Sequence, residues 1–125
     1  MNYVDPQRKA LEYLRDARNL LGDKDRWTQG VWARDRFGKQ TDPLAENATC
    51  WCALGMLRRV AKMTAMCPKW PQEFAIARDQ LLTASREKYQ KNITNVNDDK
   101  RPDRAYHDTL SVYDRAIANL KRSLK

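Results

Sequence analysis

Apolar residues recur at steps of three and four along three long stretches of the chain, which is the spacing of the buried side of an α-helix. The first stretch follows Asp5, a good helix cap, and Pro6, which is tolerated in a first turn, so it predicts a helix over residues 6–21. The same period predicts helices over residues 71–90 and 103–122. The chain is therefore expected to be mostly helical.

The stretch from residue 27 to residue 42 has a different character, because aromatic and β-branched residues replace the helical period. The segment Asp35-Arg36-Phe37-Gly38 is typical of a tight turn in which glycine takes a positive φ. We therefore expect a β-hairpin in which residues 29–34 pair with residues 38–42. Two strands are marginally stable alone, so this hairpin must pack on the helices.

A further helical period begins at Asn47 or Thr49 and continues to about Met63, with Cys50 on its apolar face. The polar, turn-rich residues 92–102 are expected to form a loop before the last helix. The predicted fold class is therefore mainly α, of the α+β kind. It has four main helices and a small β-hairpin between the first and the second.

The length of 125 residues fits one domain, residues 1–125, that can bury a real core, and 42% hydrophobic residues exclude a disordered composition. No apolar run is long enough to cross a membrane, and residues 1–6 lack the apolar stretch of a secretory signal. The odd number of cysteines, three, favours reduced thiols over a disulfide framework. The expected location is the cytoplasm of a bacterial host cell.

The net charge of +8 is spread unevenly along the chain. Residues 1–48 contain nine Lys/Arg and eight Asp/Glu, whereas residues 49–125 contain fifteen Lys/Arg and eight Asp/Glu, a balance of +7. Such a field attracts nucleic acid or an acidic protein surface, although excess basic charge also serves solubility alone. The expected polyanion-binding residues are Arg58, Arg59, Lys62, Lys100, Arg101 and Arg104.

Three motifs occur in order along the chain. The first consists of Trp27, Gln29, Gly30, Ala33, Arg34, Asp35 and Gly38, the second of Trp51, Cys52, Ala53 and Gly55, and the third of Asn97, Asp98 and Arg101. In this order and spacing the chain resembles a family of small bacterial and bacteriophage proteins whose shared domain has no assigned function. The resemblance spans roughly residues 8–120 and departs at Val96, where the family usually has Trp. It implies a shared fold and surface but no activity.

The motif residues suggest a pocket of seven members. These are Trp27, Gln29, Arg34, Asp35, Cys52, Asn97 and Asp98. In one interpretation Arg34 pairs with Asp98 or another carboxylate and fixes the hairpin to the helices. In the other, the amides of Gln29 and Asn97 join Arg34 and Asp98 in a polar pocket for a nucleotide base or an amide, because amides both donate and accept hydrogen bonds.

Two kinds of cysteine chemistry compete with a structural role. Cys52 falls in the first turn of the predicted helix, where the helix dipole and backbone N–H groups lower a thiol pKa, and His107 could act as its base. A zinc site from Cys50, Cys52, Cys67 and His107 has suitable ligand types. Residues two apart on a helix point in different directions, however, so Cys50 and Cys52 would diverge. No metal, cofactor or catalytic residue is therefore expected.

The four tryptophans, Trp27, Trp32, Trp51 and Trp70, are either stacking platforms for bases or parts of the core. Strand alternation predicts that Trp32 is the exposed one.

These features together favour a non-enzymatic binding protein. It would be an accessory protein of a phage or mobile element, for instance an inhibitor of a host defence complex, that occupies an acidic protein surface or nucleic acid. The alternative is a small-molecule or nucleotide-binding domain, or an enzyme, with its polar pocket at the motifs. The sequence leaves the oligomeric state open.

Overall fold

The computed structural model describes residues 5–125. Its elements, in chain order, are α1 (Pro6–Leu21), the 3₁₀ turn η1 (Lys24–Arg26), β1 (Ala33–Asp35), β2 (Gln40–Thr41), β3 (Ala48–Trp51), α2 (Ala53–Val60), α3 (Gln72–Tyr89), α4 (Ile93–Asn97) and α5 (Pro102–Ser123). The expected fold class, mainly α with a small β component, is confirmed. Residues 1–4, which the expected domain of residues 1–125 includes, lie outside the described residues.

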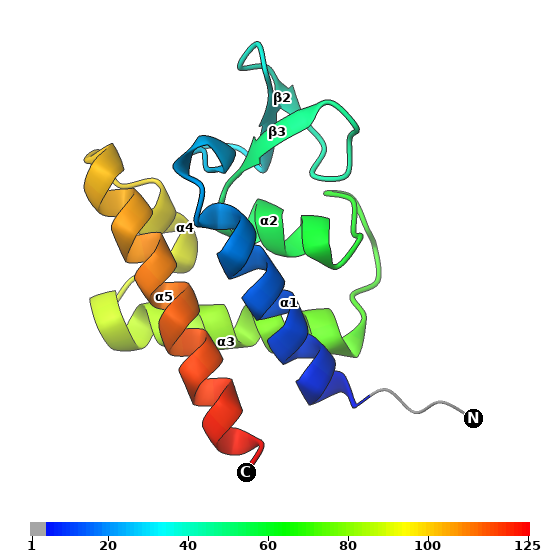
Figure 1. The fold of residues 1–125 in the computed structure, drawn as a ribbon, viewed down its shortest axis with the longest axis vertical. Coiled ribbons are helices and arrows are strands. Elements are labelled where there is room, and N and C mark those ends of the chain that lie inside the picture. Colours follow the sequence, from blue (N-terminus) through cyan, green and yellow to red (C-terminus); the bar gives the residue numbers. More distant parts are fainter. Residues whose placement is uncertain (1–4) are drawn as a thin grey trace.

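Three long helices form the body of the protein. α1 and α5 run side by side across α3, and each of the three contacts the other two (Figure 1). Their inward sides are apolar, with Leu14, Leu81 and Tyr113 fully buried between them. These helices match the predicted ranges to within a residue or two, because each carries a continuous apolar stripe.

The first helix begins as its sequence predicts. The Asp5 side chain accepts a hydrogen bond from the Gln7 N–H at 2.9 Å, and Pro6 occupies the first turn. α1 ends at Leu21, next to Gly22. The hydroxyl of Tyr106 in α5 donates to the carbonyls of Leu21 and Gly22 at 2.7 and 2.9 Å, so the end of α1 is tied to α5.

The predicted hairpin is present but shorter than expected. β1 pairs antiparallel with β2, and the turn between them contains Gly38 at φ +80°, as the sequence predicts. Residues 29–32 were expected in the strand but precede it. Figure 1 shows the sheet at one end of the helical body, beyond α2.

The prediction of a helix from Asn47 or Thr49 to Met63 is wrong at both ends. The residues before 52 form a third strand, β3, which pairs antiparallel with β1 to give the order β2-β1-β3. Cys50 therefore lies on a strand and not on the apolar face of a helix. These residues form a strand because pairing with β3 satisfies backbone groups of β1 that would otherwise be unpaired along one edge.

The segment expected to be a loop, residues 92–102, contains the short helix α4. The Asn92 side chain caps it by accepting from the Thr94 N–H at 2.9 Å, and Ile93, Val96 and Asn97 are buried. Among residues 5–125, no helix is both long and apolar enough to cross a membrane.

Candidate functional site

The side chain of Asn97, on α4, is 1% exposed and joins three segments that are distant in sequence. Its Oδ1 accepts from Trp27 Nε1 at 2.8 Å and from the backbone N–H of Ala53 at 3.0 Å. Its Nδ2 donates to the Thr28 carbonyl at 3.0 Å and to Asp98 Oδ1 at 2.9 Å. All four hydrogen-bonding positions of this amide are used inside the protein.

Gln29 and Asp98 add further bonds between the same segments. Gln29 Nε2 donates to the carbonyls of Asn97 and Asp99 at 2.9 and 2.8 Å. The Gly30 N–H donates to Asp98 Oδ1 at 2.9 Å, with Gly30 at φ +83°. We call this region, residues 27–35, 51–55 and 93–99, the polar joint, because buried polar groups join the sheet and α2 to α4.

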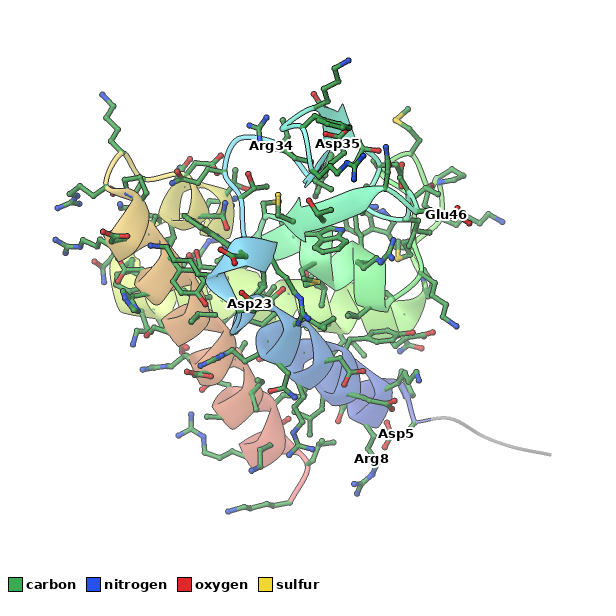
Figure 2. The ribbon with its side chains drawn as sticks, turned by 45° about the horizontal axis from the view of Figure 1, so that its top comes forward. Asp5, Arg8, Asp23, Arg34, Asp35 and Glu46 are labelled. Atoms are coloured by element: carbon green, nitrogen blue, oxygen red, sulfur yellow. The ribbon has the colours of Figure 1, made fainter. Side chains whose placement is uncertain are left out.

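Arg34 belongs to the polar joint but does not pair with Asp98, so that prediction is wrong. Its guanidinium donates to Thr28 Oγ1 at 3.0 Å, to the Gly38 carbonyl at 3.1 Å and to the Gln29 carbonyl at 3.0 Å. Arg34 therefore fixes the hairpin through neutral oxygens. Figure 2 shows it on the sheet, at the opposite end of the protein from Asp5.

Asp35 is a turn residue. Its Oδ1 accepts from the N–H groups of Phe37 and Lys39 at 2.9 and 3.0 Å, which closes the hairpin. This carboxylate is used within its own turn and does not join the other predicted pocket residues.

Cys52 is the N-cap of α2, and its Sγ accepts from the Gly55 N–H at 3.2 Å. Burial raises the pKa of this thiol to about 11, even though the Gly55 N–H acts in the opposite direction. The expected lowering of the pKa by the helix start is therefore wrong, because loss of hydration outweighs the backbone groups. At neutral pH Cys52 is a thiol and not a nucleophilic thiolate.

Gly55 fits a place that no other residue can occupy. A Cβ at this position would lie 1.9 Å from the Trp32 carbonyl oxygen, which is backbone and cannot swing away. The same Trp32 carbonyl oxygen accepts a hydrogen bond from the Cys52 N–H at 3.2 Å. The interior glycine, expected to allow close packing, therefore lets α2 approach the chain that enters β1.

A cleft of about 270 Å³ opens beside the polar joint. Its walls are Gly30, Val31, Trp32, Gln40, Cys52, Ala53, Leu54, Thr94, Asn97 and Asp98. Of the seven predicted pocket residues it includes Cys52, Asn97 and Asp98, whereas Trp27, Gln29, Arg34 and Asp35 are outside it. Its charged wall residue is Asp98, and Trp32, Val31 and Leu54 make it largely apolar.

Sequence reasoning missed several walls of this cleft. Trp32 and Leu54 stand between motif residues, so their positions inside the motifs were a usable signal. Thr94 gave no such signal, because the helix that presents it was expected to be a loop.

The six predicted polyanion-binding residues do not form one surface. Arg58 is 6% exposed and buried beneath aromatic rings, and Arg59 donates to the carbonyls of Pro43 and Ala45, both at 3.1 Å. Lys62 lies just beyond the end of α2, whereas Lys100 lies between α4 and α5. Figure 1 shows α2 and the start of α5 on opposite sides of the protein.

Two members of that group are engaged in ion pairs. Arg101 bonds both oxygens of Asp99, at 3.0 and 3.2 Å, and Arg104 lies 3.7 Å from Asp108. The Arg101 guanidinium holds the pKa of the Asp99 carboxyl well below its usual range. Arg58 and Arg59 are therefore structural, and Lys62 and Lys100 remain the uncommitted members.

The cysteines and His107 lie on separate elements. Cys50 is on β3, Cys67 is in the loop before α3, and His107 lies beside Tyr106 on α5 with its ring tilted to the Tyr106 ring. Within residues 5–125, no group of three or more His, Cys, Asp or Glu side chains is placed to hold a metal ion.

Comparison with known proteins identifies a family. The model of DUF6197, a family of unknown function, matches residues 5–119. No curated protein and no solved structure matches the chain. The matched range runs from the cap of α1 into the last turns of α5, so it includes the polar joint and the cleft.

Proposed function

The chain belongs to DUF6197, a family of unknown function, and we propose that it is a non-enzymatic accessory protein of a phage or mobile element. It acts in the cytoplasm of the host cell by occupying an acidic protein surface, for instance on a host defence complex. Binding itself is the activity, because blocking a surface requires no chemistry.

The observation that carries this proposal is the contrast between inward polar groups and outward positive charge. Asn97, Gln29 and Arg34 form their hydrogen bonds with backbone and side-chain groups of the protein itself, and the Cys52 thiol keeps its proton. Residues 49–125 still carry a charge of +7. The residues that could bind a ligand or react therefore stabilise the fold, while the positive charge of the surface attracts acidic partners.

An acidic protein is favoured over nucleic acid because the basic residues are dispersed. Four of the six expected phosphate-binding residues have protein partners, so no continuous row of free cations follows a backbone of regularly spaced phosphates. Three large apolar side chains, Phe37, Met66 and Trp70, are exposed and suit a protein surface.

A charge-neutralised variant tests this function. Lys62, Lys69 and Lys100, changed together to Gln, should slow association with a purified acidic probe protein about tenfold at low salt, because rim charges act mainly on the association rate. The control changes Arg15, Arg26 and Lys39 to Gln, which removes equal charge from the balanced half of the chain. Equal loss in both variants would mean that net charge alone is sensed.

Nucleic-acid binding is the other outcome to measure. Random duplex DNA and single-stranded RNA, titrated at low and high salt, should bind more weakly than the acidic protein. Tight binding with a slope of about 0.9 per phosphate neutralised would replace the protein partner by nucleic acid.

The cleft supports a second candidate function, the binding of a small ligand. Its apolar walls suit a flat apolar group, and the Asp98 carboxylate at its rim suits an amine or amide donor. Adenosine and cytidine are suitable probes in a two-dimensional NMR titration. Thr94→Trp, at an exposed wall position, should abolish any binding without loss of stability, whereas Asn95→Trp on the same short helix should not.

A further inference from the structure

The guanidinium of Arg58 is buried without a carboxylate partner. Its ring neighbours are Trp32, Phe74 and Trp70, whose centroids lie 4.7, 5.4 and 5.7 Å from Cζ. Nη1 donates to the Thr64 carbonyl at 2.9 Å, while Nε has no hydrogen-bond partner. Burial lowers the pKa of this group. The aromatic faces therefore supply the main attraction to this cation.

A second guanidinium continues the stack outward. Arg78, on α3, lies over the Trp70 ring with its Cζ 4.8 Å from the centroid, and Trp70 is 43% exposed. Trp32, Arg58, Trp70 and Arg78 thus alternate as ring, cation, ring and cation. We call these four residues the stacked row.

The loop that presents Trp70 is held at several points. The Thr64 carbonyl accepts from Arg58, and the Ala65 N–H donates to Asp42 Oδ2 at 3.1 Å. Met66, 87% exposed, follows directly in this loop. A fixed loop loses little conformational entropy on binding, so its exposed apolar groups are prepared for a partner.

The charge of this region is positive. Residues 58–79 contain five Lys/Arg and two Asp/Glu, a balance of +3. Arg78 forms one ion pair, with Asp79 at 3.9 Å, but this separation is beyond hydrogen-bond distance. A guanidinium stacked on a ring keeps its in-plane N–H groups available, so Arg78 is oriented to receive a carboxylate.

We propose that the outer end of the stacked row, together with Met66 and Lys69, is the docking surface for an acidic peptide segment of a partner protein. An apolar side chain of the segment packs on Trp70 and Met66, and a neighbouring carboxylate accepts two hydrogen bonds from Arg78. Trp, Arg and Met are the residue types enriched at interface centres. This inference rests on the proposed function and names its contact surface.

A peptide fits this surface better than a nucleic-acid base. Base stacking on Trp70 needs a free ring face, and Arg78 lies over the ring while Phe74 meets it edge-on with centroids 5.6 Å apart. An apolar peptide side chain needs only the exposed part of the ring, which is 43% of the residue, and the neighbouring Met66. A carboxylate needs only the outward N–H groups of Arg78, which the stack leaves open.

The test uses a synthetic peptide of Glu and Asp residues around one Leu-Phe pair, titrated into the isotopically labelled protein. We expect the Trp70 indole and Arg78 side-chain resonances to shift and the affinity to fall roughly tenfold or more in Trp70→Ala. Arg78→Gln and Met66→Ala, each at a surface position, should each weaken binding as well. Both variants keep the Trp70 ring over Arg58. They therefore still test the docking surface if Trp70→Ala disturbs the fold.

The matched control is Phe37→Ala. Phe37 is 73% exposed on the hairpin turn and has the Arg36 guanidinium over its ring at 4.7 Å, so it is an equivalent exposed aromatic–arginine pair outside the stacked row. This change should leave the affinity unaltered. Control peptides carry Lys in place of the acids, or Gly-Gly in place of Leu-Phe, and both should bind at least tenfold more weakly.

Each contrary result has one meaning. If the peptide does not bind, or binds equally well to Trp70→Ala, Arg78→Gln and Met66→Ala, this docking surface is refuted. The proposed function survives that result where the acidic probe protein still binds and still depends on Lys62, Lys69 and Lys100. If oligothymidylate binds through Trp70 in place of the peptide, the occupant is nucleic acid and the inference is overturned.

Discussion

The helical body and the polar joint are built on different physical terms. In the body, α1, α3 and α5 meet through Leu14, Leu81 and other apolar side chains that have no direction-dependent bonds to satisfy. In the polar joint, the buried side chain of Asn97 alone makes four hydrogen bonds to groups from four other residues. Contacts between apolar groups tolerate exchange at similar volume, whereas directional bonds require one residue type.

This difference changes the meaning of the motifs. Gln29, Arg34, Gly55 and Asn97 were candidates for ligand binding, yet each has a partner or a space inside the fold that explains its residue type. Where a motif lies in a region held by directional bonds, the architecture is sufficient to account for it. Surface residues such as Trp70 and Arg78, outside the motifs, then become the better functional candidates.

The difference between the helical body and the polar joint predicts that substitution of Asn97 has the largest effect on stability. Asn97→Leu removes the acceptor of Trp27 Nε1 and of the Ala53 N–H, and these buried donors stay unpaired, so the free energy of unfolding should fall by roughly 4 kcal/mol. In the body, Leu81→Met should cost less than about 1.5 kcal/mol. Urea unfolding measures both. Similar losses for the two variants would remove the distinction between the regions.

The next effect concerns the close approach at Gly55. Gly55→Ala places a Cβ against the Trp32 carbonyl and should destabilise the protein by roughly 3 kcal/mol. Gly38→Ala meets no atom within 4 Å and suffers only from its φ of +80°, so it should cost about 1 kcal/mol. Thermal unfolding ranks the two, and the reverse order would show that α2 and Trp32 separate easily.

Cys52 should show a smaller effect with a distinct pH dependence. Cys52→Ala loses the cap bond to Gly55 and should cost about 1 kcal/mol, while Cys52→Ser keeps an acceptor there and should cost less. The folded thiol has a pKa of about 11 against about 9 when unfolded, so its stabilising contribution is complete below pH 9 and is lost towards pH 11.

Unfolding of wild type and Cys52→Ala at pH 8 and pH 10.5 tests that sign. The alkaline loss of stability should be smaller in Cys52→Ala, though not absent, because burial also raises the pKa of Tyr113 well above its ordinary value. Iodoacetamide at pH 8 should modify native Cys52 on the order of a hundred times more slowly than an ordinary thiol. Fast labelling would show that the thiol is accessible and ionised.

The smallest predicted effect on stability is at Arg34, compared with Arg36 on the neighbouring turn. Arg34→Lys cannot bond Thr28, Gly38 and Gln29 at once, so it should cost about 1 kcal/mol. Arg36→Lys, on the exposed turn, should change the free energy of unfolding by less than about 0.5 kcal/mol. Indistinguishable midpoints in urea would mean that Arg34 is dispensable for the hairpin.

Prediction from sequence succeeded where the signal was long and periodic. The helices expected over residues 6–21, 71–90 and 103–122 are confirmed, as is the turn at Gly38, because apolar stripes and glycine conformation are local properties. It failed at β3, since four residues are too few to show alternation and pairing with β1 overrode their helical pattern. Trp32 was expected to be the exposed tryptophan, but it is half-buried against Arg58, and Trp70 is exposed.

The candidate sites divide in the same way. Asn97, Asp98 and Cys52 all line the cleft, but their placement depended on α4, whose cap at Asn92 was the overlooked signal. The burial of Arg58 had no signal in sequence, because arginine on a helix normally faces water and only the convergence of three rings makes its burial tolerable.

By itself the sequence determined the helical body, the hairpin turn and the excess of positive charge, since these follow from composition and from the spacing of neighbouring residues. Only the tertiary structure decided which polar side chains make their hydrogen bonds inside the protein and which remain available at the surface. The reason is that a hydrogen bond such as that from Trp27 to Asn97 joins residues distant in sequence, and its existence depends on how the intervening elements pack.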